Sequence, residues 1–170
     1  IYTEHNVQER YHPLTRRANL WTMQMNSRVL CVSNEVAESL KDRTDETLHD
    51  RIQTLPNGVN TRRFSREVVE QMAQPEALHE LDPGTMVIGS VAVFRKQKRL
   101  DRWIALAKKL DAHFDQLEFL LVGDGPEEDT VRRLIKEAGL SSKFHLPGRL
   151  DEVRPWLERM DIYLMTSEHE

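Results

Sequence analysis

Cysteine is almost absent from this sequence, because Cys31 is the only one among 170 residues. A disulfide within the chain is therefore excluded, which is typical of proteins from a reducing compartment. Cys31 lies in the apolar run RVLCVS. We expect it to pack as a small hydrophobic side chain rather than to act as a nucleophile.

Long apolar runs are missing as well. None approaches the roughly 20 residues that a membrane-spanning helix needs, and no secretory signal peptide is visible. The net charge is only −4 with histidine neutral, so the chain as a whole has no general attraction for nucleic acid or anionic lipid. Its 39% hydrophobic and 31% charged residues are typical of a globular protein.

The two ends lack the polar tails with which domains usually end. The chain begins at IYTEHN, without a methionine, and stops at YLMTSEHE, just after an apolar run. We therefore expect a fragment of a longer protein. Apolar edges exposed at both ends would favour pairing between chains.

The first third of the sequence predicts a small α/β unit. SRVLCVS is typical of a strand and residues 14–27 of a helix, whereas IYTEH could be a strand but is too short to assign by itself. Ser33 is placed to cap a second helix, NEVAESLKDR. The short strand RIQTL then ends at the turn signal PNG.

From Met86 onward the order is β-α-β-α-β-α-β. The strands are TMVIGSVAVF, LEFLLVG, KFHLPG and DIYLMTS, and the first helix carries Trp103, Ile104, Ala107 and Leu110 on one face. This alternation predicts a parallel, Rossmann-like sheet with right-handed crossovers. Ligands of such sheets bind at the carboxyl ends of the strands, which are here VFRKQK, GDGP, PGR and TSEHE.

Two glycines, Gly123 and Gly125, mark one of these strand ends. Such a turn can let the backbone close around a phosphate, or it can serve only as a tight connection between strand and helix. The dinucleotide fingerprint needs a third glycine three residues later, where this sequence has Glu128. The turn therefore argues against hydride transfer with a nicotinamide cofactor.

Cations gather at the end of the first strand of the sheet. Arg95, Lys96, Lys98 and Arg99 could neutralise a diphosphate, as point charges or as bidentate forks. They could equally form a solvated, charged turn. The sequence leaves both interpretations open.

Histidines and carboxylates at two other strand ends are further candidates. Glu168, His169 and Glu170 could bind sugar hydroxyls or move protons, or they could form an exposed terminus. His5 follows the first short strand among polar neighbours, where it is either structural or functional. No second histidine or aspartate has ligand spacing to the terminal group, so we expect no metal site.

Five segments, taken in order, resemble a known family. The segments are RVLCVSNEVAESL, LPNGVNTRRF, IGSVAVFRKQKRLDRWIALAKKL, FLLVGDGPEEDTVRRLIKEAGL and FHLPGRLDEVRPWLERMDIYLMTSEHE. Their order resembles that found in family-4 (group 1) retaining glycosyltransferases of the GT-B fold. The resemblance covers nearly the whole chain. It implies that residues 1–64 are the end of an amino-terminal acceptor-binding domain and that residues 65–85 are a linker. Residues 86–170 would be the first four strands of a truncated nucleotide-sugar-binding domain.

The resemblance also implies catalytic roles. Lys98 resembles the lysine that contacts the donor diphosphate, where charge builds as the glycosidic bond breaks. Many members carry an arginine five residues earlier; that place is Val93 here, and Arg95 is the candidate to replace it. Ser167 and Glu170 resemble the start of the family's most diagnostic motif, in which Glu170 would face the donor sugar.

The implied donor site extends over several strand ends. PGRL resembles the loop that packs against the nucleotide base, and the glycine turn would line the same cleft. His5 would be an active-site histidine at the end of an amino-domain strand. The donor-binding candidates are Gly123, Gly125, Gly148, Arg149, Leu150 and His169.

The resemblance thus predicts an enzyme that transfers a sugar from a nucleotide-sugar donor to a glycan or lipid acceptor, with retention of anomeric configuration. No cofactor or metal is expected, because side-chain cations and a helix dipole would neutralise the diphosphate. The parent would be cytoplasmic, would bind no nucleic acid, and could associate loosely with a membrane; the fragment alone would be inactive. The alternatives are a non-catalytic α/β nucleotide-binding or interaction module and a dehydrogenase-type domain.

Overall fold

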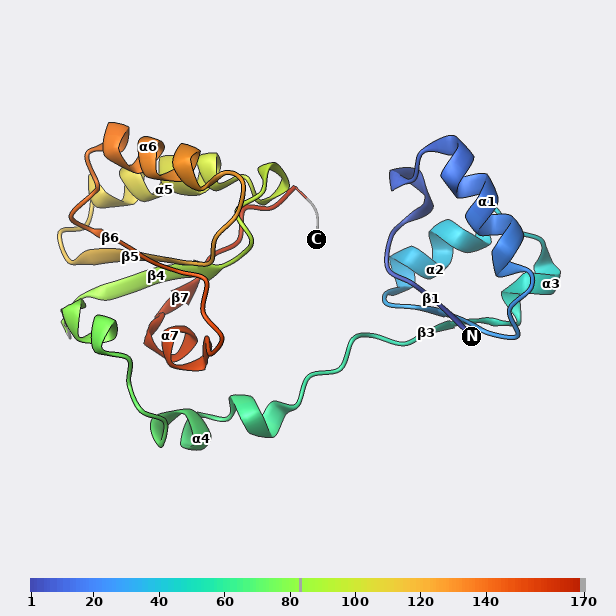
Figure 1. Ribbon diagram of the computed structural model, residues 1–170, viewed down its shortest axis with the longest axis horizontal. Coiled ribbons are helices and arrows are strands. Elements are labelled where there is room, and N and C mark those ends of the chain that lie inside the picture. Colours follow the sequence, from blue (N-terminus) through green and yellow to red (C-terminus); the bar gives the residue numbers. More distant parts are fainter. Residues whose placement is uncertain (83, 169–170) are drawn as a thin grey trace. The chain divides into compact units, whose positions relative to one another are not determined.

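The computed structural model of the chain describes residues 1–82 and 84–168. The chain divides into two compact units, Ile1–Val59 and Asn60–Glu170 (Figure 1). Each unit contains a parallel β-sheet with helices, so the predicted α/β class is confirmed. Among the described residues, no helix has the length and apolar character needed to cross a bilayer.

The first unit is built on three short parallel strands in the order β1-β2-β3. Cys31 pairs with Glu4 on one side and with Thr54 on the other, so the carboxyl ends of all three strands lie at one edge of the sheet. The elements in chain order are β1 (Tyr2–Glu4), η1 (Gln8–Arg10), α1 (Pro13–Met23), β2 (Val29–Cys31), α2 (Asn34–Lys41), α3 (Glu46–His49) and β3 (Ile52–Thr54).

Cys31 lies in the core of the first unit. It is fully buried and belongs to the same cluster as Met23, Val29 and Leu40. Burial raises the pKa of its thiol to about 11, so the thiol is neutral at pH 7 and a poor nucleophile. The prediction of a packed, unreactive side chain is confirmed.

Helix α2 begins at the serine cap that the sequence predicts. The Ser33 Oγ accepts a hydrogen bond from the backbone N–H of Val36 at 3.2 Å. This bond satisfies one of the N–H groups that the first turn of a helix leaves without a partner. The cap fixes the start of the helix, so that Val36, Ala37 and Leu40 face the core.

The second unit contains a four-stranded parallel sheet in the order β6-β5-β4-β7. The chain moves outward from β4 (Met86–Val91) through β5 (Leu117–Val122) to β6 (Phe144–Gly148). It then crosses back, and β7 (Ile162–Tyr163) pairs with the other side of β4. The strand order therefore reverses beside β4, and ligands of open parallel sheets bind at such a reversal.

Helices cover both faces of this sheet. Figure 1 shows α5 (Leu100–Asp111) and α6 (Glu128–Ala138) on one side, and α7 (Arg154–Arg159) on the other. The predicted inner face of α5 is confirmed, because Trp103, Ile104 and Ala107 are buried and Leu110 packs against the same cluster. The short helices of the unit are η2 (Thr61–Phe64), α4 (Arg66–Glu70), η3 (Glu76–Glu80) and η4 (Lys96–Lys98).

Trp103 anchors the core beneath α5 and α6. Its ring makes edge contacts with Phe119 and Phe144, at centroid distances of 5.8 and 5.6 Å. Its indole Nε1 donates to the backbone oxygen of Leu164 at 3.2 Å. One side chain thus joins α5, two strands and the segment after β7, which is part of the candidate site described below.

The polar segment between the sheets packs onto the second unit. Leu78 and Leu81 are buried in one cluster with Trp156 of α7. Farther upstream, the Arg66 Nε donates to Glu158 of α7 at 3.1 Å. These contacts give residues 60–82 a fixed position on the face of the sheet that α7 covers.

We predict that Ser33→Ala frees the first turn of α2. Losing one capping bond costs about 1 kcal/mol, so amide hydrogens of α2 should exchange with solvent roughly five-fold faster. Hydrogen exchange with mass spectrometry measures this directly, and Ser27→Ala, at an exposed position outside the helices, is the control. Unchanged exchange in Ser33→Ala would show that the cap does not hold the helix.

Candidate functional site

The strand reversal brings two loops together at the carboxyl edge of the second sheet. The loop after β4 carries the cationic residues, and the segment after β7 carries Thr166 and Ser167. Between them lies a narrow crevice beside Lys98, with a volume of only about 10 Å³. Its lining residues are Ser90, Val91, Ala92, Lys98, Leu100, Met165, Thr166 and Ser167.

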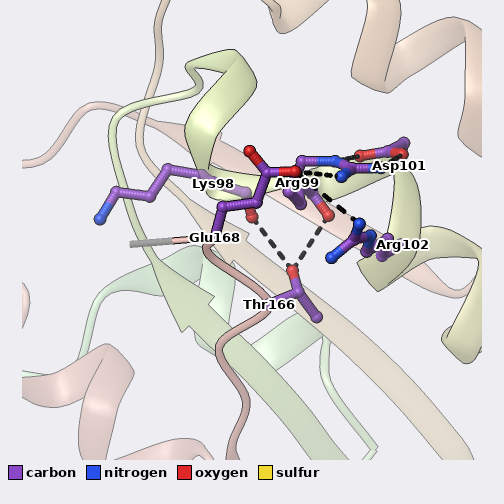
Figure 2. A network of polar contacts seen from close by, with 6 residues as sticks. All are labelled: Lys98, Arg99, Asp101, Arg102, Thr166 and Glu168. Atoms are coloured by element: carbon purple, nitrogen blue, oxygen red, sulfur yellow. Dashed lines mark hydrogen bonds and ion pairs between the residues drawn. The ribbon is translucent and has the colours of Figure 1, made fainter. Parts of the chain in front are cut away.

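The segment after β7 is attached to η4 by backbone and hydroxyl hydrogen bonds. The Thr166 Oγ1 donates to the backbone oxygens of Lys98 and Arg99, at 3.1 and 3.0 Å (Figure 2). The backbone N–H of Glu168 donates to the oxygen of Gln97 at 2.9 Å. We call these contacts, together with the ion pairs of Arg99, the latch. The sequence predicts a strand over 161–167, but β7 ends at Tyr163: Leu164 still donates to the Gly89 oxygen of β4 at 2.9 Å, whereas Thr166 and Glu168 bond to residues 97–99.

Arg99 supplies the charged part of the latch. Its guanidinium contacts Asp101 at 2.8 Å and Glu168 at 2.5 Å, and Arg102 lies 3.7 Å from the same Glu168 carboxylate (Figure 2). Hydrogen bonds from Arg99 hold the pKa of Asp101 below its usual value. The Glu168 side chain is therefore a partner of Arg99 in the described structure.

Arg99 also has an unusual backbone. Its φ of 49° and ψ of 46° lie in the left-handed region, and it is the only described non-glycine residue with positive φ. That conformation costs roughly 1–2 kcal/mol for a side chain with a Cβ. It turns the chain sharply between η4 and α5, so that Lys98 and Arg99 diverge.

The predicted cationic cluster is divided into two groups. Figure 2 shows the Lys98 side chain extending away from the Arg99 guanidinium, and Lys98 lines the crevice between β4 and β7. Arg95, Lys96 and Arg99 line a different hollow of about 580 Å³, beside Glu127 of the loop before α6. The site beside the strand reversal therefore contains Lys98, whereas Arg95 borders its own hollow.

The glycine turn is explained by close packing between loops. A Cβ on Gly123 would lie 1.9 Å from the backbone oxygen of Ala92, and one on Gly125 would lie 2.6 Å from that of Phe94. Both glycines have positive φ, 130° and 153°. Phe94 N–H donates to the oxygen of Asp124 at 2.7 Å. The turn thus holds the loop after β4 in place.

Gly148 extends this connection to the next strand. Its backbone oxygen accepts from the N–H of Gly123 at 2.9 Å, so two predicted base-site elements do lie side by side. Gly148 itself has a φ of 79°. The adjacent Arg149 is exposed, whereas Leu150 packs against the cluster that contains Trp156.

His5 belongs to the first unit, on the loop after β1, where its side chain is exposed. The loop is organised by the buried carboxylate of Glu4, which accepts from the backbone N–H groups of His5 and Asn6 at 2.9 and 3.1 Å. Glu4 also accepts from Tyr11 at 2.8 Å and from the Gln8 amide at 3.1 Å. Sequence reasoning missed Glu4, although an acidic residue inside a predicted strand can signal a buried, hydrogen-bonded carboxylate.

Two predicted residues, His169 and Glu170, lie outside the described residues. Within residues 1–82 and 84–168, no three histidine, cysteine, aspartate or glutamate side chains are grouped to hold a metal ion. The prediction of a metal-independent reaction stays a prediction.

With this geometry in view, comparison with known proteins gives the family. The family model for glycosyl transferases group 1 matches residues 76–170, more than half of the chain. The chain therefore belongs to the group 1 glycosyltransferase family. Neither the binding-module alternative nor the dehydrogenase alternative is favoured by this match.

Curated relatives support the same class. The chain is 28% identical over 141 residues to N-acetyl-alpha-D-glucosaminyl L-malate synthase from Bacillus anthracis, covering 82% of the chain and 36% of that protein. It is 27% identical over 162 residues to 2-deoxystreptamine glucosyltransferase from Streptomyces kanamyceticus, covering 94% of the chain and 41% of that protein. The chain thus spans about two-fifths of the length of these relatives.

A solved structure shares the fold. The Anabaena protein Alr3699/HepE, in complex with UDP-glucose, aligns with a TM-score of 0.77 at 16% identity. The alignment covers 98% of the chain and 46% of that protein. The predicted GT-B fold is confirmed, because the alignment includes residues of both units.

We predict that Arg99→Ala and Arg99→Gly differ in stability. Both variants lose the ion pairs with Asp101 and Glu168, but glycine adopts the left-handed conformation without the Cβ penalty. The glycine variant should therefore exceed the alanine variant by about 1 kcal/mol in free energy of unfolding. Urea denaturation measures the difference, and equal stabilities would mean that the backbone of Arg99 is not strained.

Proposed function

We propose that the protein is a retaining glycosyltransferase that moves a sugar from a nucleotide-sugar donor to a hydroxyl of a glycan or lipid acceptor. The observation that carries this proposal is the crevice at the strand reversal. There Lys98, on the loop that follows β4, and the segment Thr166–Ser167, which follows β7, are fixed together by the latch. Both elements belong to the part of the chain that the family model matches.

Lys98 would neutralise the departing diphosphate. When the bond between the anomeric carbon and the nucleotide breaks, negative charge builds on the diphosphate oxygen. A cation held at that place lowers the barrier, because its attraction is greater in the transition state than in the bound substrate. The latch helps because it fixes the backbone on both sides of Lys98 before the donor binds.

The nucleotide would lie across the adjacent loops. The turn at Gly123 and the loop at Gly148 are joined by a hydrogen bond and stand at the ends of neighbouring strands. Gly125, Arg149 and Leu150 complete the proposed base site, with His169 on the sugar side. That the similarly folded Anabaena protein was solved with UDP-glucose supports a uridine nucleotide sugar as the first donor to test.

The remaining proposed roles follow from the family resemblance. Glu170 would face the donor sugar, and His5 would act in the acceptor half, with Glu4 as the positioning residue that orders its loop. Arg95 would replace the arginine that many family members carry at the place of Val93. The proposal includes a cytoplasmic location, consistent with a chain that has a single, buried cysteine.

We predict that Lys98→Ala lowers turnover of the whole protein about 100-fold or more, because the loss of one charge-stabilising group typically costs that much. Turnover is measured as release of nucleoside diphosphate from a panel of nucleotide sugars. The matched control is Lys108→Ala, which removes an exposed lysine of α5 outside the crevice. Stability of both variants toward urea should be close to that of the unchanged protein, and equal turnover in Lys98→Ala would contradict the role of Lys98.

A further inference from the structure

The chain between β3 and η2 contains a short segment that is exposed and belongs to no helix or strand. We call residues 56–59 of this segment the free stretch. Before it, the backbone N–H of Leu55 donates to the oxygen of Cys31 at 2.8 Å. After it, Asn60 caps η2. The free stretch is therefore held at its two ends and ends where the chain divides into its two compact units.

The glycine of the free stretch is not required by the backbone around it. The φ of Gly58 lies outside the left-handed region, in contrast to those of Gly123 and Gly125. A Cβ built on Gly58 would meet no atom within 4 Å. Within the described residues, neither conformation nor close packing thus demands a glycine at this position.

Asn57 and Gly58 form the only Asn-Gly pair of the sequence. Asparagine is a chemically labile residue. When glycine follows it, the glycine nitrogen can approach the asparagine Cγ without hindrance from a Cβ. The approach also needs a side-chain amide and a backbone that nothing holds in place. Among the described residues, neither Asn57 nor Gly58 has a hydrogen-bond partner.

We propose that Asn57 is a modification site, at which the side-chain amide is lost as ammonia. A bond forms between the Gly58 nitrogen and the Asn57 Cγ, and the bond between Cγ and Nδ2 breaks. Ammonia leaves with the proton of the Gly58 N–H. The resulting succinimide adds one water molecule and opens to aspartate or to isoaspartate. Water is the only co-reactant, so the step needs neither a cofactor nor a second protein.

The reaction changes the charge and the length of the free stretch. A neutral amide becomes a carboxylate, shortly before the exposed arginines Arg62 and Arg63 of η2. In isoaspartate the main chain runs through the side-chain carbonyl carbon, which makes the connection between the two units longer. The hydrophobic core of the first unit includes no residue of the free stretch. This site goes beyond the proposed sugar transfer and does not depend on it.

Asn60 provides a matched control in the same exposed segment. It is followed by Thr61, whose branched side chain hinders attack by the backbone nitrogen. Its Oδ1 also accepts a hydrogen bond from the N–H of Arg63 at 3.4 Å. Trypsin cleaves after Arg51 and Arg62, so a single peptide, IQTLPNGVNTR, carries both asparagines.

The test is incubation of the 170-residue chain in ¹⁸O-water at neutral pH, followed by digestion in ordinary water and mass spectrometry of that peptide. Product formed during the incubation carries one heavy oxygen, which separates it from product formed during digestion. We expect the label at Asn57 and not at Asn60. Gly58→Ala should slow labelling about ten-fold or more, because it adds a Cβ. Its stability toward urea should be unchanged, since the space around Gly58 is open.

A second measurement compares the folded chain with the chain unfolded in guanidinium chloride. Because nothing in the described structure holds Asn57 or Gly58, labelling of the folded chain should stay within about five-fold of the unfolded rate. A larger slowing in the folded chain would overturn the proposal. Equal labelling of Asn57 and Asn60, or an unchanged rate in Gly58→Ala, would overturn it as well.

Discussion

The attachment of the segment after β7 to η4 is the contact on which the candidate site depends. Parallel strands fix only their own paired residues, and β7 pairs at just Ile162 and Tyr163. Beyond that point, the hydroxyl of Thr166 and the backbone of Glu168 bind η4, and Arg99 adds the ion pair. Without these bonds, the two sides of the crevice would be joined only by the short strand pair and by the bonds of Leu164 to Gly89 and Trp103.

The rest of the second unit supports this attachment. Trp103 reaches from α5 to the backbone of Leu164, and the aromatic contacts below it hold α5 against the sheet. The loop after β4 also packs against the glycine turn, so closely that a side chain at Gly123 or Gly125 would clash with the backbone of that loop. The geometry of the candidate site therefore comes mainly from backbone hydrogen bonds, and Lys98 supplies its positive charge.

The sequence allowed much of the architecture to be predicted, because periodicity and caps are local signals. The buried face of α5 and the Ser33 cap followed from spacing and residue type alone. The separation of Lys98 from Arg95 did not, because Arg95 precedes η4 with extended dihedral angles and nothing in the sequence marks where that short helix begins. The left-handed backbone conformation of Arg99 could not be predicted either, because glycine or asparagine normally occupies such a position.

The most direct test of the account is to follow backbone amide signals of the ¹⁵N-labelled chain while UDP is added. The account predicts that the largest shifts occur at the crevice, in Ala92, Lys98 and Ser167, with smaller ones at the glycine turn. Shifts confined to the hollow that Arg95 and Lys96 line would place the diphosphate elsewhere. That result would contradict the central claim that the crevice beside β4 and β7 is the donor site.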